Sequence, residues 1–160
     1  GVGPGLHLLV RRPASHALLR NVLSPEFLWE RPQTCPGGLD LYLLVEGDFR
    51  QIAMQLACFQ DIAAEGCFSV AMIAELSESL DTYGPWFYPR LFWECGSIGQ
   101  VLYLEAEAVG LRATGIGCFF DDPMHDFLGI KHSQYQNLYQ LTVGGPVEDR
   151  RLTTLPAYAE

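Results

Sequence analysis

Apolar runs of strand length alternate with segments of helical periodicity along this chain. Residues 6–10 alternate after a Gly- and Pro-rich start, which predicts a short strand. Residues 39–45 (LDLYLLV) are almost continuously apolar. Such a run is typical of a strand covered on both faces, so we expect it at the centre of a sheet. The prolines and the Gly-Gly pair of residues 24–38 predict an irregular connection before it.

A helix is predicted to begin after Asp48, because its carboxylate can accept hydrogen bonds from the first-turn N–H groups. This helix should end near Gly66, with a break at Asp61. Residues 67–76 (CFSVAMIAEL) then predict a second apolar strand. Helix between strands is therefore the expected pattern of the first half.

The strongest helical signal follows a turn at residues 83–85 and ends at Gly110. Apolar residues recur there at steps of three and four and predict one buried stripe, made of Leu91, Cys95, Ile98, Leu102, Ala106 and Val109. Gly96 and Gly99 lie inside this helix, each at a cost of about 1 kcal/mol relative to alanine. We expect another backbone or a flat ligand to approach the helix closely at these positions.

The last third of the chain predicts strand, glycine loop and helix, followed by a final strand. Residues 111–117 lead into the loop, a short helix runs to Leu128, and residues 138–143 form the strand. Residues 147–160 are a polar tail that cannot build a core and should lie across another surface. No internal repeat is found, so residues 1–160 are interpreted as a single domain.

Composition and charge exclude several classes of protein. Of 160 residues, 49% are hydrophobic and 18% charged, which excludes intrinsic disorder. The formal net charge of −9 argues against nucleic acid and anionic membranes as partners. No apolar run is long enough for a membrane span, and the start resembles no signal peptide. Five cysteines without a CxxC pair favour free thiols in a reducing compartment, so we expect a cytoplasmic protein.

Familiar catalytic motifs are not found in the sequence. There is no HExxH or paired-ligand spacing among the four histidines, so no metal site is expected. GxSxG, P-loop and GxGxxG patterns are also missing. The less ordinary segment is Gly115, Ile116, Gly117 and Cys118, where glycine removes the side chain between backbone and ligand. The alternative is a tight turn whose glycines need a positive φ.

A succession of motifs gives that segment a context. In chain order they are residues 3–7 (GPGLH), 56–60 (LACFQ), 83–90 (YGPWFYPR), 94–100 (ECGSIGQ), 104–111 (LEAEAVGL), 115–122 (GIGCFFDD), 128–130 (LGI) and 141–146 (LTVGGP). In order and spacing this succession resembles the FMN-dependent nitroreductase family. The branch that it resembles most is the SagB-type dehydrogenases.

The resemblance implies an α+β fold, with a mainly antiparallel sheet flanked by helices, in a homodimer that holds FMN at the subunit interface. It places Gly115, Ile116, Gly117 and Cys118 along the isoalloxazine ring, with an N–H near Gly117 or Cys118 directed at flavin N5. In the tail it implies a phosphate contact from Arg151, with Arg150 second, because the guanidinium fork binds phosphate oxygens in pairs. The alternative is a solvated arginine pair.

One part of the family pattern is missing: the N-terminal helix with phosphate-binding arginines and the proline loop after it. We therefore expect one of three cases. The sequence is the C-terminal part of a longer protein, or a complementary N-terminal half comes from a partner, or the chain is a relative that has lost flavin.

The resemblance predicts an FMN-dependent oxidoreductase that takes hydride from NAD(P)H or directly from a substrate onto flavin N5. The electrons would go to a nitro compound, a quinone or a peptide azoline. Tyr88 and Arg90 are candidates for the substrate side, and an aromatic core contact is the alternative. Two other hypotheses stay open: a non-catalytic dimerisation or binding module, and a structural subunit that pairs with a complete flavoprotein.

Overall fold

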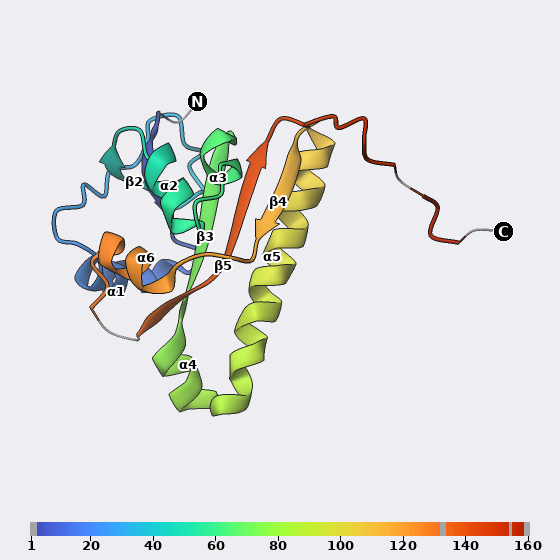
Figure 1. The fold of residues 1–160 in the computed structure, drawn as a ribbon. Helices are drawn as coiled ribbons and strands as arrows, with labels where there is room; N and C mark the ends of the chain where they lie inside the picture. Colours follow the sequence, from blue (N-terminus) through green and yellow to red (C-terminus); the bar gives the residue numbers. More distant parts are fainter. Residues whose placement is uncertain (1–2, 132–133, 154, 159–160) are drawn as a thin grey trace.

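The structure is a computed structural model that describes residues 3–131, 134–153 and 155–158. The first half contains β1 (Gly5–Leu9), α1 (His16–Val22), β2 (Leu41–Glu46), α2 (Arg50–Leu56), α3 (Ile62–Glu65), β3 (Phe68–Glu75) and α4 (Leu76–Tyr83). The second half contains α5 (Tyr88–Ala108), β4 (Arg112–Ile116), α6 (Asp121–Leu128) and β5 (Tyr135–Gly144). Short 3-10 turns at Pro13–Ser15 and Pro85–Phe87 precede α1 and α5. Figure 1 shows the whole arrangement.

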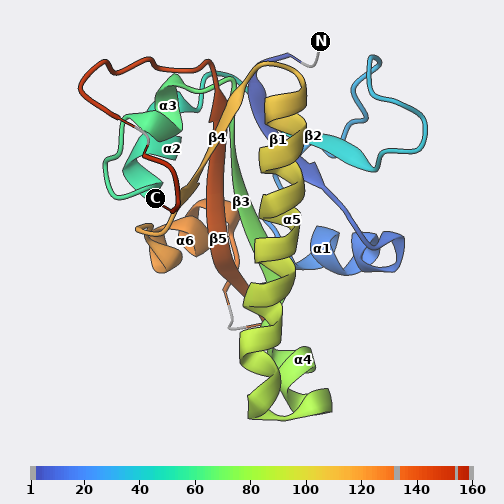
Figure 2. The ribbon, with the colours of Figure 1, turned by 90° about the vertical axis from the view of Figure 1, so that its right-hand side faces the viewer.

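A three-stranded antiparallel sheet with the order β3–β5–β4 is the centre of the fold. β5 is flanked on both sides and is the most deeply buried strand. Its apolar side chains pack under α5, while Thr142 donates from its hydroxyl to the Ile62 carbonyl of α3 (3.2 Å). The two faces of β5 are therefore covered by different helices, as the views in Figures 1 and 2 agree.

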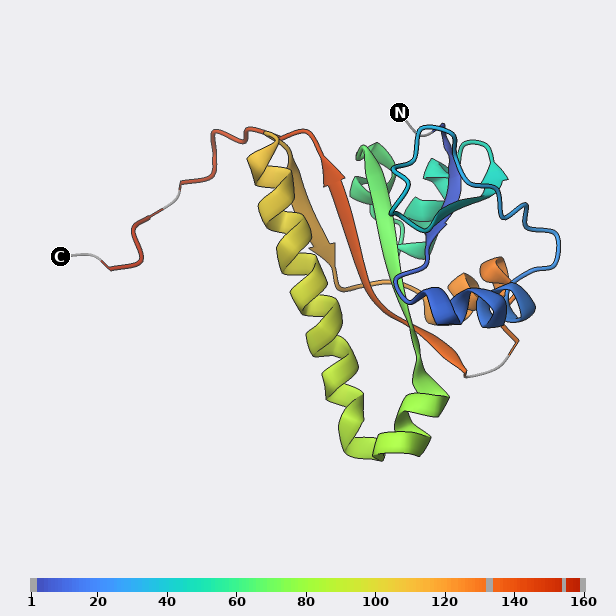
Figure 3. The ribbon, with the colours of Figure 1, turned by 180° about the vertical axis from the view of Figure 1, so that it is seen from behind.

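The expectation that residues 39–45 form a central strand is wrong. β2 pairs with β1 in a separate two-stranded antiparallel sheet, and one isolated bridge joins Leu43 to Glu30. Most of its residues are half-buried, and only Leu44 is fully buried. Tyr42 packs against the core cluster to which α1 and α6 contribute, and the connection before β2 bonds its other edge, with the Leu28 N–H donating to the Leu44 carbonyl (2.9 Å). Figure 3 shows this two-stranded sheet, in blue and cyan, beside the green β3.

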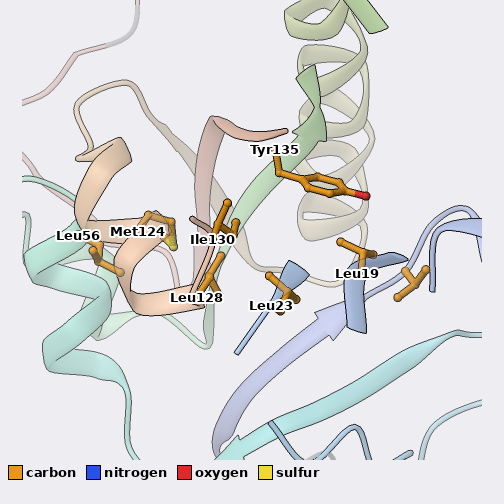
Figure 4. Close-up of a cluster of buried hydrophobic side chains, with 8 residues drawn as sticks. Leu19, Leu23, Leu56, Met124, Leu128, Ile130 and Tyr135 are labelled. Atoms are coloured by element: carbon orange, nitrogen blue, oxygen red, sulfur yellow. The ribbon is translucent and has the colours of Figure 1, made fainter. Parts of the chain in front are cut away.

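The largest core cluster joins this two-stranded sheet to the three-stranded one. Figure 4 shows it, with side chains from α1, α2, α6 and the start of β5 meeting in one place. Its buried members are Val10, Leu19, Leu23, Leu56, Met124, Leu128, Ile130 and Tyr135. The architecture of the described residues is α+β, in agreement with the predicted fold class.

Helix α5 lies along the other face of the three-stranded sheet (Figure 2). The predicted stripe is buried or half-buried from Leu91 to Ala106, but Val109 is 70% exposed because the helix ends at Ala108. Gly99 faces the Tyr139 ring, and a Cβ there would lie 3.0 Å from Cε1. Gly96 lies on the outer face, where a Cβ would meet nothing within 4 Å. Close packing thus explains the glycine at position 99 but not the one at position 96.

The predicted helix break is confirmed, since α2 ends at Leu56 and α3 begins at Ile62. Asp48 accepts from the Arg50 backbone N–H (3.0 Å), as expected of a residue at a helix start. Among the described residues, no helix combines the length and apolarity that crossing a bilayer would need.

Candidate functional site

The glycine segment continues from strand β4 into the loop of residues 117–120, which leads to α6. Gly115 and Ile116 belong to β4 and pair with Leu141 and Gln140 of β5. The Gly115 N–H donates to the Tyr103 hydroxyl on α5 (2.6 Å). Ile116 is 2% exposed and packs on Ala57 and Ala63. Both residues are thus held in the sheet, while Gly117 and Cys118 are exposed.

Hydrogen bonds fix the 117–120 loop to the turn of residues 57–60, which follows α2. The side-chain amide of Gln60 donates to the carbonyls of Cys118 (3.0 Å) and Ala57 (2.8 Å). The Phe120 N–H donates to the Leu56 carbonyl (2.9 Å). These bonds satisfy main-chain groups on both segments, so the path of the loop is determined by α2 and its turn.

The two glycines of the segment have different surroundings. A Cβ on Gly115 would overlap the Tyr139 hydroxyl, so glycine at this position makes room for a side chain of the same protein. A Cβ on Gly117 would meet nothing within 4 Å. Neither glycine has a positive φ, so the tight-turn interpretation does not explain them. Gly117 therefore leaves bare, accessible main chain, which a ligand can approach closely.

An open apolar groove of about 620 Å³ lies beside the 117–120 loop. It runs between α2 and α6 and is lined by Ile52, Gln55, Leu56, Phe59, Phe120, Pro123 and Phe127. The rings of Phe59 and Phe120 meet edge to face at 6.2 Å between centroids. Because Phe120 belongs to both features, the groove adjoins the loop. Its lining suits a flat, mostly apolar molecule.

Buried polar atoms lie behind the loop. Gln140, which pairs with Ile116, is 3% exposed, and its Nε2 has no partner among the described residues. Asp121 is the first residue of α6, and its buried Oδ1 also has no hydrogen-bond partner among the described residues. Burial raises the pKa of its carboxyl. Perturbed acids beside a cleft are common at functional sites. The sequence interpretation missed Asp121 as a candidate, although it belongs to the 115–122 motif.

The tail arginines begin at the opposite end of the sheet. In the β4–β5 ladder, Ile116 pairs with Gln140 but Arg112 pairs with Gly144, so the tail leaves the end remote from Gly117. It extends away from the body (Figure 1). Arg151 forms an ion pair with Asp149 (2.7 Å) and its side chain is exposed, as is Arg150. One chain alone therefore does not bring Arg150 or Arg151 to the loop.

Tyr88 and Arg90 lie in the first turn of α5. Arg90 stacks over the exposed rings of Trp86 and Trp93, at 5.7 and 4.8 Å from their centroids. The Tyr88 ring meets the Phe92 ring edge to face at 5.0 Å between centroids, but Tyr88 is 44% exposed, so this aromatic contact lies at the surface and not in the core. Tyr103, which touches Gly115, is roughly 20 Å further along the helix axis from either residue. Within one chain these two candidates are not part of the loop site.

Three further residues shape the site, and the interpretation of the sequence assigned them no role. Tyr103 and Tyr139 hold Gly115 from the α5 side, and Gln60 holds Cys118. Gln60 and Cys58 belong to the 56–60 motif, and membership in that motif is the sequence feature that could have identified them.

In the described part of the chain, no group of three or more His, Cys, Asp or Glu side chains could hold a metal ion.

Comparison with known proteins matches this chain to a family and to a solved structure. The model of the nitroreductase family matches residues 32–145. A crystal structure of a candidate nitroreductase from Anabaena variabilis superposes with a TM-score of 0.63 at 27% identity, over 72% of this chain. The chain spans only 25% of the length of that protein. None of the curated proteins matches.

Proposed function

Because the chain belongs to the nitroreductase family, we propose that it is the part of an FMN-dependent oxidoreductase that carries the flavin-facing loop. The finer assignment within this proposal is the SagB-type dehydrogenase class, on the motifs of residues 94–146. The electron donor would be NAD(P)H or the substrate itself, and the substrate a small molecule or a modified peptide.

The observation that carries the proposal is the accessible main chain at Gly117, on a loop whose path is held by hydrogen bonds. A preorganised N–H donor near flavin N5 would tune how readily the ring accepts hydride, and the flavin itself supplies the redox chemistry. Gly117 and Cys118 would line the ring, with Gly115 and Ile116 holding them in register from β4. The adjoining apolar groove would accept the flat part of a substrate.

We further propose that the site is completed by a second copy of the chain. The outer face of α5 carries an exposed stripe formed by Trp93, Gly96, Gln100 and Leu104, and the space at Gly96 lets another backbone approach. Val147, Leu152 and Leu155 in the tail are each more than three-quarters exposed. Exposed apolar surface of this kind is typical of an interface between subunits. A tail crossing to the other subunit would carry Arg150 and Arg151 to the partner's flavin phosphate.

A non-catalytic dimerisation or binding module is the second candidate. The observation that favours it is the position of the arginines, because Arg151 is paired with Asp149 and lies far from the loop within one chain. Such a module would keep the α5 surface and have no flavin. A structural subunit that pairs with a complete flavoprotein would share these features and would co-purify with that protein.

Flavin binding separates the two candidates. Two samples are compared: residues 1–160 alone, and the same residues expressed together with any sequence that flanks them in the native protein. We expect a yellow protein that retains FMN through gel filtration, elutes as a dimer and bleaches anaerobically with NAD(P)H or dithionite. A colourless dimer that does not quench added FMN would overturn the proposal and leave the binding module.

Replacing Arg151 with alanine tests the tail. Loss of a charge-assisted contact with the FMN phosphate should weaken FMN binding by roughly 10- to 100-fold. Fluorescence quenching of FMN measures the affinity, and Asp149→Ala is the matched variant, since it frees Arg151 from its ion pair and should not weaken binding. Unchanged affinity of Arg151→Ala would remove this residue from the phosphate site.

A further inference from the structure

Two cysteines face each other across the contact between the 117–120 loop and the 57–60 turn. Cys58 belongs to the turn and Cys118 to the loop. The Gln60 side chain bonds the Cys118 carbonyl, and the Phe120 N–H bonds the Leu56 carbonyl, so hydrogen bonds bracket the cysteines on both segments. Cys58 and Phe59 both have left-handed backbones, with φ of 53° and 59°. Non-glycine residues rarely adopt this conformation, which identifies the turn as a specialised structure.

The hydrogen bonds of Gln60 and Phe120 hold the two segments, and with them Cys58 and Cys118, close together. Hydrogen bonding with Cys118 is the largest cause that raises the pKa of Cys58 to about 11, and burial adds to it. Cys58 is half-buried and Cys118 is exposed. Cys118 is therefore the thiol that a reagent reaches first, and Cys58 lies behind it as its partner.

The remaining cysteines have other surroundings. Cys35 lies within hydrogen-bonding distance of main-chain carbonyls of its own loop (3.5 Å to Leu39 O). Cys95 lies on the buried face of α5. Cys67 is exposed at the start of β3 and serves as a single-thiol control of similar accessibility to Cys118.

We propose that Cys58 and Cys118 form a dithiol site that peroxide-class oxidants close to a disulfide, linking the 117–120 loop covalently to the turn after α2. The Cys118 thiolate attacks one oxygen of hydrogen peroxide, which breaks the O–O bond, gives a sulfenic acid and releases hydroxide that is protonated to water. Cys58 loses its proton and attacks the Cys118 sulfur, which forms the S–S bond and releases a second water. Two thiols are oxidised, and one peroxide is reduced to two waters.

The dithiol site does not depend on bound flavin. It uses only residues of this chain, so it is retained if the proposed function fails. Its closure would add a covalent link to the hydrogen bonds that already hold the loop whose main chain is proposed to line the flavin. Thiol exchange with a small dithiol reopens it, which makes the link reversible.

The test is thiol counting and peptide mapping on the purified reduced chain, with and without FMN. Stoichiometric peroxide should lower the thiols that react with Ellman's reagent in denaturant from five to three, and dithiothreitol should restore five. Cleavage after glutamate separates Cys58 (residues 47–65) from Cys67 (residues 66–75) and leaves Cys118 in residues 108–148. The unreduced digest should contain the 47–65 and 108–148 peptides as one linked species.

Matched variants and a second probe complete the test. Cys58→Ser and Cys118→Ser should each abolish the linked species, and Cys67→Ser should retain it. Phenylarsine oxide bridges adjacent thiols, so it should block two thiols in the wild type and in Cys67→Ser, and none in Cys58→Ser after a monothiol wash. Free thiols at both positions after oxidation, or a link to another cysteine, would overturn the dithiol site. Flavin binding is read separately from absorbance, so the two proposals fail independently.

Discussion

Replacing Gly117 with valine should abolish flavin binding and leave the fold intact. A valine side chain would fill the open space over the main chain of the 117–120 loop and prevent the close approach of a planar ring. The side chain would meet no protein atom within 4 Å of its Cβ, so the free energy of unfolding should change by less than about 0.5 kcal/mol. We expect an FMN affinity at least ~100-fold lower, measured by fluorescence quenching.

The matched control is Gly37→Val. Gly37 is also exposed, a Cβ there would meet no atom within 4 Å, and its φ is not positive, but it lies in the loop before β2. This variant should bind FMN as the wild type does. If Gly117→Val binds FMN with unchanged affinity, the main chain at this position is not where the ring lies, and the redox proposal loses its supporting observation.

Replacing Gly115 with alanine should instead lower the stability of the fold. The added methyl would overlap the Tyr139 hydroxyl, and the Tyr139 ring is also held against Gly99 on α5, where it has little room to move. Overpacking of this kind costs about 1–3 kcal/mol. Urea denaturation should show a lower midpoint at an unchanged m-value.

A double-mutant cycle identifies the cause of that loss. Tyr139→Phe removes the hydroxyl that the alanine methyl would meet, so the double variant should recover a large part of the stability lost in Gly115→Ala. Purely additive effects of the two substitutions would show that the cost of Gly115→Ala arises elsewhere. The neighbouring glycines 115 and 117 would thus be separated experimentally, one acting in packing and the other in binding.

Local pattern predicted most of the strands and the long helix. The periodicity of residues 91–106 agrees with α5, and the apolar runs agree with β3 and β5. α1 was not predicted, because a seven-residue helix carries less than two full periods of pattern. The expectation that residues 39–45 form a central strand was wrong, because an apolar run does not reveal which strands will lie beside it.

The candidate site divides in the same way. The motifs identified the 115–118 segment, and the exposed Gly117 agrees with a loop that is open to a ligand. They did not distinguish Gly115 from Gly117, because that difference depends on Tyr139, a residue 24 positions further along the chain. Nor did they reveal that the segments of Cys58 and Cys118 are bonded to each other, since sixty residues separate the two cysteines in the sequence.

The amino-acid sequence by itself determined most of the helices and strands, the family and the glycine segment that we propose to face a flavin, because these depend on local periodicity and short motifs. Only the tertiary structure decided which strands pair, which glycine is filled by a neighbour and which thiols meet. Those features depend on contacts between distant segments, and such contacts exist only once burial of apolar side chains has brought the segments together.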